Sequence, residues 1–214
     1  MTRRIEHVLF DLGNVLVRFD WDIAIGRLKP YLSTNLSHLL ETHTQAFEDL
    51  FHEPGIALES GRIDFDEFYE ITSDRLAITI EKKEFRRIWC DIFQANEEMV
   101  ILGQDLSKRY GTWLVSNTSE AHYEWIINKF PQILFYRGAG LSYELGVMKP
   151  SAQYYSRIIT KFGIKPSLSV FIDDLQENVD GAIKAGMVGI VFNDKKQLAV
   201  ELERLGINNY PKRS

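Results

Sequence analysis

The sequence predicts an α/β protein, with a parallel β-sheet core, helices on both faces of the sheet and a small all-helical insertion. Two observations support this fold class. Four short apolar runs have the β-branched and aromatic composition of buried strands, and amphipathic helical segments lie between them. About a hundred residues separate the first run from the second, far more than a crossover helix needs, which indicates an insertion.

The four predicted strands are residues 8–10, 112–115, 169–172 and 188–192. The first three are followed by polar side chains: Asp11, then Ser116 and Asn117, then Asp173 and Asp174. Ligands of open α/β sheets bind at the carboxyl ends of the strands. We therefore expect these polar residues to meet in one crevice.

Apolar residues at helical spacing predict the helices of the insertion, over residues 23–32, 36–51, 65–76 and 82–93. Either Asp64 or Asp66 is placed to cap the third of them. We interpret the loop of residues 59–64 as an ordinary helix connection, which contacts substrate only if it faces the crevice. A last helix is predicted over residues 195–205.

These elements predict two domains. Residues 1–17 and 94–214 form the α/β core, and residues 18–93 form a helical cap domain.

The chain has 214 residues, 45% hydrophobic and 26% charged, which is typical of a globular protein. Its net charge of −5 argues against a nucleic-acid or anionic-membrane surface, so we expect neither partner. We also expect a monomer or weak dimer. The single cysteine, Cys90, cannot form an internal disulfide and lies in an apolar stretch, where burial is expected. No segment has signal-peptide or membrane-spanning character, so the expected location is cytoplasmic.

Asp11 is the first candidate for chemistry. It ends an apolar strand and precedes a Gly-Asn turn, which exposes the carboxylate and offers backbone N–H groups to an anion. Taken alone, the same pattern is more easily explained by an aspartate that caps a turn.

Two further features are compatible with an anionic ligand. Ser116 and Asn117 supply a hydroxyl and an amide that hydrogen-bond phosphate oxygens without adding charge. Lys149 immediately precedes Pro150, whose ring holds the preceding backbone extended and limits where the lysine points. On their own, a helix cap and a solvated lysine explain these residues equally well.

Asp173 and Asp174 end the third predicted strand as adjacent acids. Paired carboxylates at the end of an apolar strand are costly unless a cation or a positive side chain neutralises them. Oxygen ligands of this kind suit Mg²⁺.

The four motifs, Asp-Leu-Gly-Asn-Val, Ser-Asn, Lys-Pro and Asp-Asp, resemble in this order those of the haloacid dehalogenase-like (HAD) hydrolase superfamily. The resemblance covers the whole chain and implies a Rossmann-like core with a helical cap of the first type. The opening motif and the Leu-Glu-Ser-Gly-Arg-Ile loop look closest to a bacterial branch that includes an α-glucose-1-phosphate phosphatase.

The resemblance also implies the role of each motif residue. Asp11 matches the nucleophile, which attacks phosphorus and becomes a transient aspartyl phosphate. Ser116 and Asn117 match the phosphate-binding pair. Lys149 matches the lysine that neutralises the nucleophile and the transferring phosphoryl group.

The implied cofactor is Mg²⁺, held by the carboxylates of Asp11 and Asp174 and by the backbone carbonyl of Gly13. Asp173 is then a supporting or alternative ligand. Asn178 stands where many members place another acid, and it is expected to help orient the metal. The cation would offset the repulsion between an anionic nucleophile and an anionic ester.

Gly13 departs from the common pattern, because most phosphatases of the superfamily carry a second aspartate there that moves a proton. General acid–base help is worth about a hundred- to ten-thousandfold. We therefore expect slow turnover, or selectivity for good leaving groups such as an anomeric sugar phosphate, unless the cap or the substrate supplies the proton. No histidine is well placed by the sequence for that role; the five are His7, His38, His43, His52 and His122.

The predicted function is Mg²⁺-dependent hydrolysis of a small phosphorylated substrate, a sugar phosphate or a similar monoester. Two alternatives stay open. A 2-haloacid dehalogenase of the same superfamily also lacks the second aspartate and needs no Mg²⁺, and a binding protein would keep the pocket without turnover. Arg18 and Arg62 are candidate cap-side contacts, although surface exposure explains each of them more simply.

Overall fold

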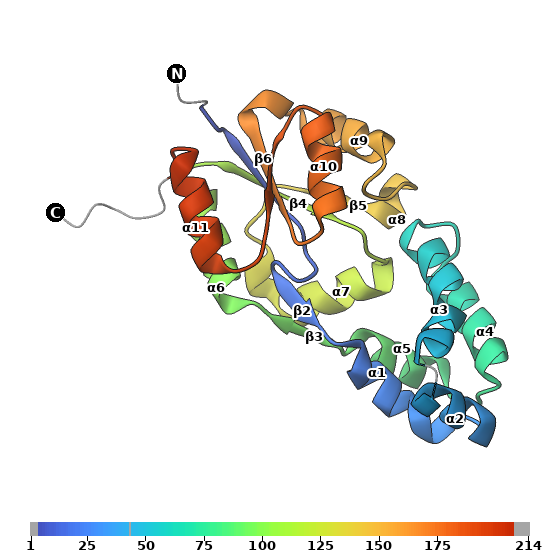
Figure 1. Cartoon of the computed structure of the whole chain (residues 1–214). Coiled ribbons are helices and arrows are strands. Elements are labelled where there is room, and N and C mark those ends of the chain that lie inside the picture. Colours follow the sequence, from blue (N-terminus) through green and yellow to red (C-terminus); the bar gives the residue numbers. More distant parts are fainter. Residues whose placement is uncertain (1–3, 43, 208–214) are drawn as a thin grey trace.

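The computed structural model describes residues 4–42 and 44–207, and a five-stranded sheet lies at its centre (Figure 1). The strand order is β5-β4-β1-β6-β7, and all four neighbouring pairs are parallel. The strands are β1 (His7–Phe10), β4 (Gly111–Ser116), β5 (Ala139–Leu141), β6 (Ser169–Asp173) and β7 (Val188–Val191). The four predicted strands correspond to β1, β4, β6 and β7, so the predicted parallel sheet is confirmed.

The edge strand β5 was not predicted. It has three residues, and its central residue is Gly140, which weakens the pattern of a strand in the sequence. A Cβ atom at this position would lie 2.6 Å from Cγ2 of Ile158. The glycine therefore lets helix α9 (Ala152–Phe162) pack closely on the sheet.

Side chains of β1 alternate between two hydrophobic clusters, one on each face of the sheet. Leu9 packs with Tyr154 and Tyr155 of α9, whereas Val8 and Phe10 pack on the opposite face. Besides α9, the core helices are α6 (Glu97–Ser107), α7 (Glu120–Lys129), α8 (Ser142–Leu145), α10 (Gln176–Lys184) and α11 (Lys195–Arg204), with 3₁₀ turns at Pro131–Ile133 and Pro166–Leu168. Helices α9 and α10 cover the first face of the sheet, and α6, α7 and α11 cover the second (Figure 1).

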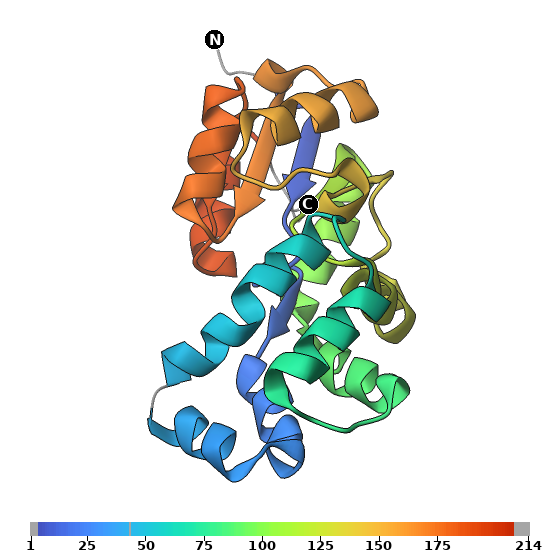
Figure 2. The same cartoon turned by 90° about the vertical axis from the view of Figure 1, so that its right-hand side faces the viewer.

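The insertion is a group of helices beside the sheet (Figure 2). It consists of α1 (Trp21–Leu28), a 3₁₀ turn (Lys29–Tyr31), α2 (Thr34–Thr42), α3 (Thr44–Glu59), α4 (Phe65–Leu76) and α5 (Lys82–Cys90). Two short antiparallel strands, β2 (Val17–Phe19) and β3 (Phe93–Ala95), join its ends to the core. At three residues each, they are too short for the sequence pattern to predict. The division into a core of residues 1–17 and 94–214 and a cap of residues 18–93 stays our proposal.

Aromatic side chains form the interior of the insertion. Phe68 and Phe85 are fully buried, and Trp89 packs on both, with ring centroids 4.8 and 6.2 Å away. Cys90 is buried beside them, as predicted, and burial raises the pKa of its thiol to about 12. The thiol is therefore a packing group, since the reactive form is the thiolate.

The prediction of one helix over residues 36–51 is wrong in two respects. The structure has two helices there, α2 and α3, and α3 continues through Pro54 to Glu59. A proline inside a helix leaves the carbonyl four residues earlier without its N–H donor. Here Arg75 Nη1 donates to that carbonyl, Leu50 O, at 3.1 Å. A side chain from α4 thus replaces the missing backbone donor, and α3 extends to Glu59.

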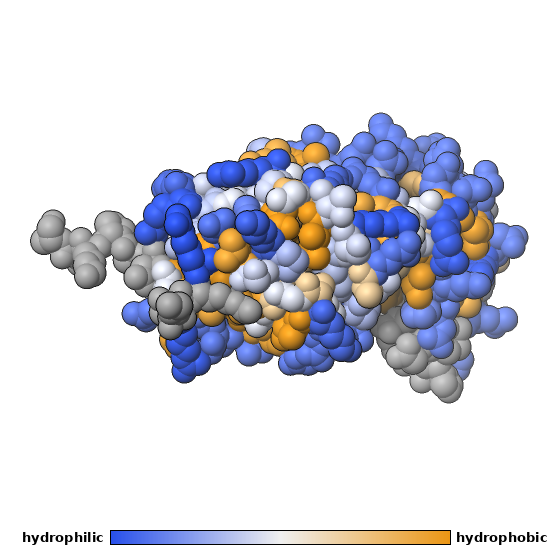
Figure 3. All heavy atoms as spheres, turned by 90° about the horizontal axis from the view of Figure 1, so that it is seen from above, coloured by the Kyte–Doolittle hydropathy of each residue, from blue (hydrophilic) through white to orange (hydrophobic). Residues whose placement is uncertain are grey.

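Hydrophilic residues cover much of the face shown in Figure 3, with hydrophobic residues between them in separate small groups. Among the helices of the described residues, none is long and apolar enough to cross a membrane.

Helix α4 begins at a capping box. Asp64 Oδ1 accepts a hydrogen bond from Glu67 N at 2.9 Å, and Glu67 Oε2 accepts one from Asp64 N at 3.1 Å. The structure therefore selects Asp64 over Asp66 as the cap.

We expect that replacing the Asp64 cap lowers the stability of the protein measurably. Asp64→Ala should lower the free energy of unfolding by about 1 kcal/mol, because the Glu67 N–H loses its acceptor. Urea unfolding should show a lower midpoint with an unchanged slope. Asp66→Ala is the control, since it removes only an exposed pair with Lys82 and should cost less than about 1 kcal/mol. Equal losses in both variants would contradict the assignment.

Candidate active site

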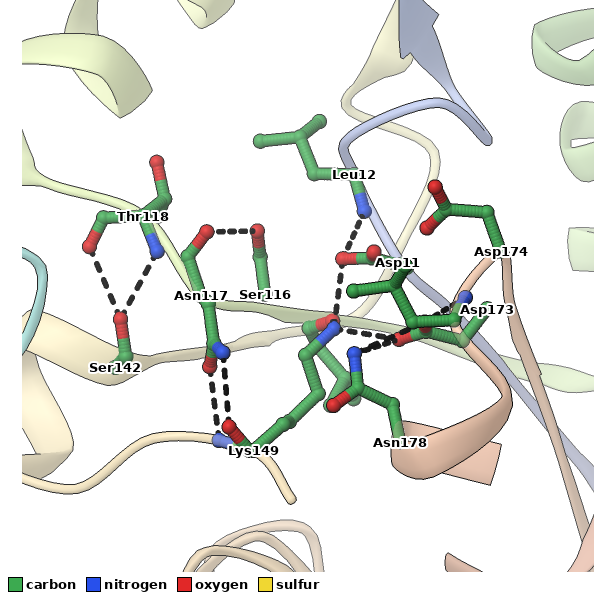
Figure 4. A network of polar contacts seen from close by, with 12 residues as sticks. Asp11, Leu12, Ser116, Asn117, Thr118, Ser142, Lys149, Asp173, Asp174 and Asn178 are labelled. Atoms are coloured by element: carbon green, nitrogen blue, oxygen red, sulfur yellow. Dashed lines mark hydrogen bonds and ion pairs between the residues drawn. The ribbon is translucent and has the colours of Figure 1, made fainter. Parts of the chain in front are cut away.

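The polar residues that follow three strands lie at one edge of the sheet, as the sequence predicts (Figure 4). Asp11 continues β1, and its backbone N–H donates to Ile172 O of β6 at 2.9 Å. Asp173 ends β6, and Ser116 ends β4 on the other side of β1. The parallel order of β4, β1 and β6 therefore brings these side chains together.

Lys149 lies at the centre of the group. Its Nζ is 2.9 Å from Asp11 Oδ1 and 2.7 Å from Asp173 Oδ2, and it also donates to Val115 O at 3.2 Å. The lysine side chain is 1% exposed and that of Asp173 is 0% exposed. One buried ammonium group therefore holds two carboxylates that belong to neighbouring strands.

Asn117 fixes the backbone of Lys149. Its Nδ2 donates to Lys149 O at 3.0 Å, and its Oδ1 accepts from Lys149 N at 2.9 Å. Both ends of the amide are thus used to position the lysine. The predicted contact between Asn117 and phosphate oxygens stays a prediction. Ser116 is buried, and its Oγ donates a long bond of 3.3 Å to Asn117 O.

Asp173 is enclosed by donors on its other side as well. Asn178 Nδ2 lies 3.0 and 3.2 Å from its two carboxylate oxygens, and Leu175 N donates to Oδ1 at 2.9 Å. With Lys149, these contacts satisfy a fully buried carboxylate. Asn178 therefore supports Asp173 directly.

Asp174 is only partly buried, and its Oδ2 accepts a hydrogen bond from Asn14 Nδ2 at 2.9 Å. Asn14 has a φ of 54°, in the left-handed region that asparagine tolerates better than most residues. This turn after β1 brings the Asn14 amide to Asp174, a contact that the sequence analysis did not predict.

Asp11, Asp173 and Asp174 each offer a carboxylate oxygen, and these oxygens all lie within 4.8 Å of one another. Lys149 pairs with Asp11 and Asp173, so the three carboxylates carry more negative charge than its ammonium group neutralises. Such a set of oxygen donors, with an excess of negative charge, fits a hard divalent cation.

The charges in this group act on each other. Burial raises the pKa of Asp11, and the positive charge of Lys149 opposes that rise. Burial by itself would lower the pKa of Lys149, yet the charges of Asp11 and Asp173 hold it above its usual value. The lysine is therefore a permanent cation at neutral pH.

A cavity of about 320 Å³ opens over the group. Gly13, Thr118 and Asp174 line it together with Asp11 and Lys149. Glu59 from the insertion also lines it; the sequence analysis did not name this residue by itself as a site candidate. The loop of residues 59–64, interpreted as a helix connection, does join α3 to α4, but its first residue also faces the crevice.

The candidate cap-side arginines lie elsewhere. Arg18 and Arg62 are both exposed, and neither lines this cavity.

His122 is buried at the cavity wall, with Nε2 3.2 Å from Trp89 O, and burial lowers its pKa to about 4. It is a packed neutral residue, in agreement with the sequence analysis. His43 lies outside the described residues.

Several known proteins are similar to this chain in sequence or in fold. A D-ribitol-5-phosphate phosphatase from Bacteroides thetaiotaomicron is 27% identical over 191 residues, covering 82% of this chain and 85% of that protein. A sesquiterpene phosphatase from Aspergillus oryzae is 23% identical over 216 residues, covering 96% and 98%. A HAD family enzyme from Bacteroides thetaiotaomicron, solved with magnesium and inorganic phosphate, superposes with a TM-score of 0.76 at 25% identity, covering 91% and 98%.

A sequence model of the haloacid dehalogenase-like hydrolases matches residues 5–186, which is most of the chain. The parallel sheet, the helical insertion and the order of the polar strand ends agree with that match. The chain therefore belongs to the haloacid dehalogenase-like hydrolase family.

Proposed function

We propose that this protein hydrolyses phosphate monoesters with Mg²⁺ and that Asp11 is the nucleophile. The observation that carries the proposal is the position of Asp11 Oδ1, 2.9 Å from the buried Lys149 Nζ and in a cluster of three aspartates. This carboxylate has a cation at its side and a cavity in front of it. Such an environment favours attack on an electrophile that carries negative charge.

The residues present fit a resident Mg²⁺ ion. Asp173 already receives hydrogen bonds from Lys149 and Asn178, whereas Asp174 is partly exposed at the cavity. We therefore assign Asp11, Asp174 and the carbonyl of Gly13 as ligands, and Asp173 and Asn178 as their support. When bound, the ion would neutralise charge on the phosphate oxygens.

The protein groups then have distinct tasks. An Asp11 oxygen attacks phosphorus, and the bond between phosphorus and the ester oxygen breaks, which gives an aspartyl phosphate. The Lys149 ammonium stabilises the charge on the nucleophile and on the transferring phosphoryl group. Ser116 hydrogen-bonds phosphoryl oxygens. Water then attacks phosphorus, which releases inorganic phosphate and restores the Asp11 carboxylate.

Two similar proteins support a phosphatase. One is described as a D-ribitol-5-phosphate phosphatase and one as a sesquiterpene phosphatase, so a polar and an apolar leaving group both occur among the relatives. The narrower resemblance to the branch with an α-glucose-1-phosphate phosphatase stays a prediction, as do a sugar phosphate substrate and a monomer or weak dimer. The three-aspartate cluster disfavours the alternative of a metal-independent dehalogenase.

Removing the nucleophile should abolish turnover. Asp11→Asn should lower kcat on p-nitrophenyl phosphate by about a thousandfold or more, because the amide cannot form the acyl phosphate. Release of inorganic phosphate is the measurement. Asp105→Asn, at an exposed pair with Lys108, is the control and should retain wild-type activity. Equal inactivity of wild type and Asp11→Asn across a panel of phosphate esters, with both binding phosphosugars, would support a binding protein instead.

Removal of the metal should also stop the reaction. Treatment with EDTA should reduce phosphate release to background, and excess Mg²⁺ should restore it, because the carboxylate cluster loses the ion that offsets its charge. Full activity in EDTA would contradict the metal assignment. Chloride release from 2-chloropropionate that persists in EDTA would indicate a dehalogenase.

A further inference from the structure

Glu59 belongs to the insertion but is fixed to the core. Its backbone carbonyl accepts a hydrogen bond of 2.5 Å from Ser142 Oγ, and Thr118 N donates to the same Oγ at 2.9 Å. Gly61 packs so closely on α8 that an added Cβ would lie 2.2 Å from Tyr143 O. The end of α3 therefore rests on the start of α8, which Thr118 joins to the segment after β4 and the candidate phosphate site.

Glu59 stands where two cavities meet. The cavity of about 320 Å³ contains Asp11, and a second cavity of about 360 Å³ lies among α1, α3 and α5. Trp21, Glu59 and His122 line both cavities. If Asp11 attacks phosphorus in the first cavity and the organic group extends into the second, the leaving oxygen lies at this junction.

Glu59 is the suitable proton donor among these three shared residues. The indole of Trp21 is a hydrogen-bond donor that does not ionise near neutral pH, which excludes it as an acid. His122 is neutral, and its Nε2 proton is directed to Trp89 O. The carboxylate of Glu59 receives no hydrogen bond from any side chain that the structure describes, so it is available to a ligand.

We propose that Glu59 is the catalytic acid and base that replaces the side chain missing at Gly13. In the first step, its carboxyl proton passes to the leaving oxygen as the ester bond breaks. In the second step, its carboxylate takes a proton from the water that attacks the aspartyl phosphate. Glu59 thus regains in the second step the proton that it gave up in the first. This inference rests on the proposed function, and it removes the reason to expect slow turnover.

The electrostatic environment agrees with this role. Burial raises the pKa of Glu59 to about 7, against the opposing charge of Lys149, so both protonation states are accessible near neutral pH. The other ionisable residues around the two cavities are Asp11, Asp49, His52, His122 and Asp174. Because the first step needs the protonated form, turnover of a poor leaving group should fall as the pH rises through about 7.

The test compares leaving groups. Glu59→Gln should lower kcat on an alkyl phosphate by about a hundred- to ten-thousandfold, and on p-nitrophenyl phosphate by much less, because nitrophenolate departs without protonation. The fall of alkyl phosphate turnover above pH 7 should disappear. Glu53→Gln, on the same helix and exposed, is the control and should change neither quantity. Equal losses on both substrates, with an unchanged pH profile, would overturn the proposal.

A second variant separates a lost acid from a disturbed structure. Gly13→Asp restores the usual acid of the family, and a Cβ there meets only the Phe19 ring, at 3.2 Å from Cε1 and 3.7 Å from Cδ1. Combined with Glu59→Gln, it should recover alkyl phosphate turnover at least about tenfold. No recovery would count against an acid role for Glu59. The proposed function is tested separately by Asp11→Asn and by EDTA, which do not involve Glu59, so the two failures are distinguishable.

The second cavity supports a separate inference about the substrate. Its walls are mainly apolar and aromatic, from Trp21, Phe51 and Trp89 with the side chains Ala24, Ile25, Leu28, Ile56 and Leu58. The Trp89 ring centroid is 4.7 Å from that of Trp21 and 5.5 Å from that of Phe51. Trp89 Nε1 is buried and has no hydrogen-bond partner among the described residues.

We infer that this cavity binds an apolar organic group of the phosphate ester. Aromatic and aliphatic walls stabilise a hydrocarbon by removing it from water, whereas the hydroxyl groups of a sugar would lose hydrogen bonds there. The inference departs from the sugar phosphate that the sequence suggests. It too rests on the proposed function.

Gly55 offers a way to fill the cavity. It lines the cavity wall on α3, and an added Cβ meets no atom within 4 Å. Wild type should show a higher kcat/KM for octyl phosphate than for glycerol 3-phosphate. Gly55→Leu should lower kcat/KM for octyl phosphate about tenfold or more, mainly through KM, and leave glycerol 3-phosphate within about twofold.

Gly26→Leu is the matched control, because Gly26 is also helical with open space around it but is exposed and outside the cavity. It should behave as wild type on both substrates. A wild-type preference for glycerol 3-phosphate, or equal effects of Gly55→Leu on both esters, would contradict an apolar group in this cavity.

Discussion

The candidate site depends on the ion cluster that Lys149 forms with Asp11 and Asp173. Taking two carboxylates and an ammonium group out of water is costly, and their attraction compensates only when the geometry is good and the remaining donors and acceptors are satisfied. Here the Nζ to oxygen distances are 2.9 and 2.7 Å, and Asn178 and Leu175 satisfy Asp173 further. The cluster thus fixes Asp11 at the cavity.

The segment that follows β4 connects this cluster to the insertion. Asn117 holds the backbone of Lys149, and its neighbour Thr118 binds Ser142, which in turn binds the carbonyl of Glu59. One short segment therefore positions both the cation beside the nucleophile and the end of α3. These hydrogen bonds connect the candidate phosphate site to the backbone of the proposed proton donor.

Much of the core could be predicted from the sequence, because its strands are apolar and end in polar residues at predictable places. Asp11, Ser116 and Asp173 were placed together because each lies at the carboxyl end of a predicted strand, and the structure brings them to one edge. By contrast, the three-residue strands β2, β3 and β5 carry too few residues for a pattern.

Contacts between distant residues were not predictable. Arg75 replaces the backbone donor that Pro54 lacks, and this contact lets α3 reach Glu59 beyond the expected end of the helix. Similarly, the Asn14 amide reaches Asp174, 160 positions away. Such pairings depend on the tertiary arrangement, and a glutamate in a loop resembles any solvated acid until that arrangement is known.

The most direct test of the account is chemical trapping of the phosphorylated nucleophile. Wild-type protein would be mixed with Mg²⁺ and p-nitrophenyl phosphate, quenched in acid within one turnover, digested and analysed by mass spectrometry. We expect one phosphoryl group on the peptide that contains Asp11, removed by hydroxylamine as an acyl phosphate is. Turnover without a phosphoryl group on that peptide, or with one on another residue, would contradict it.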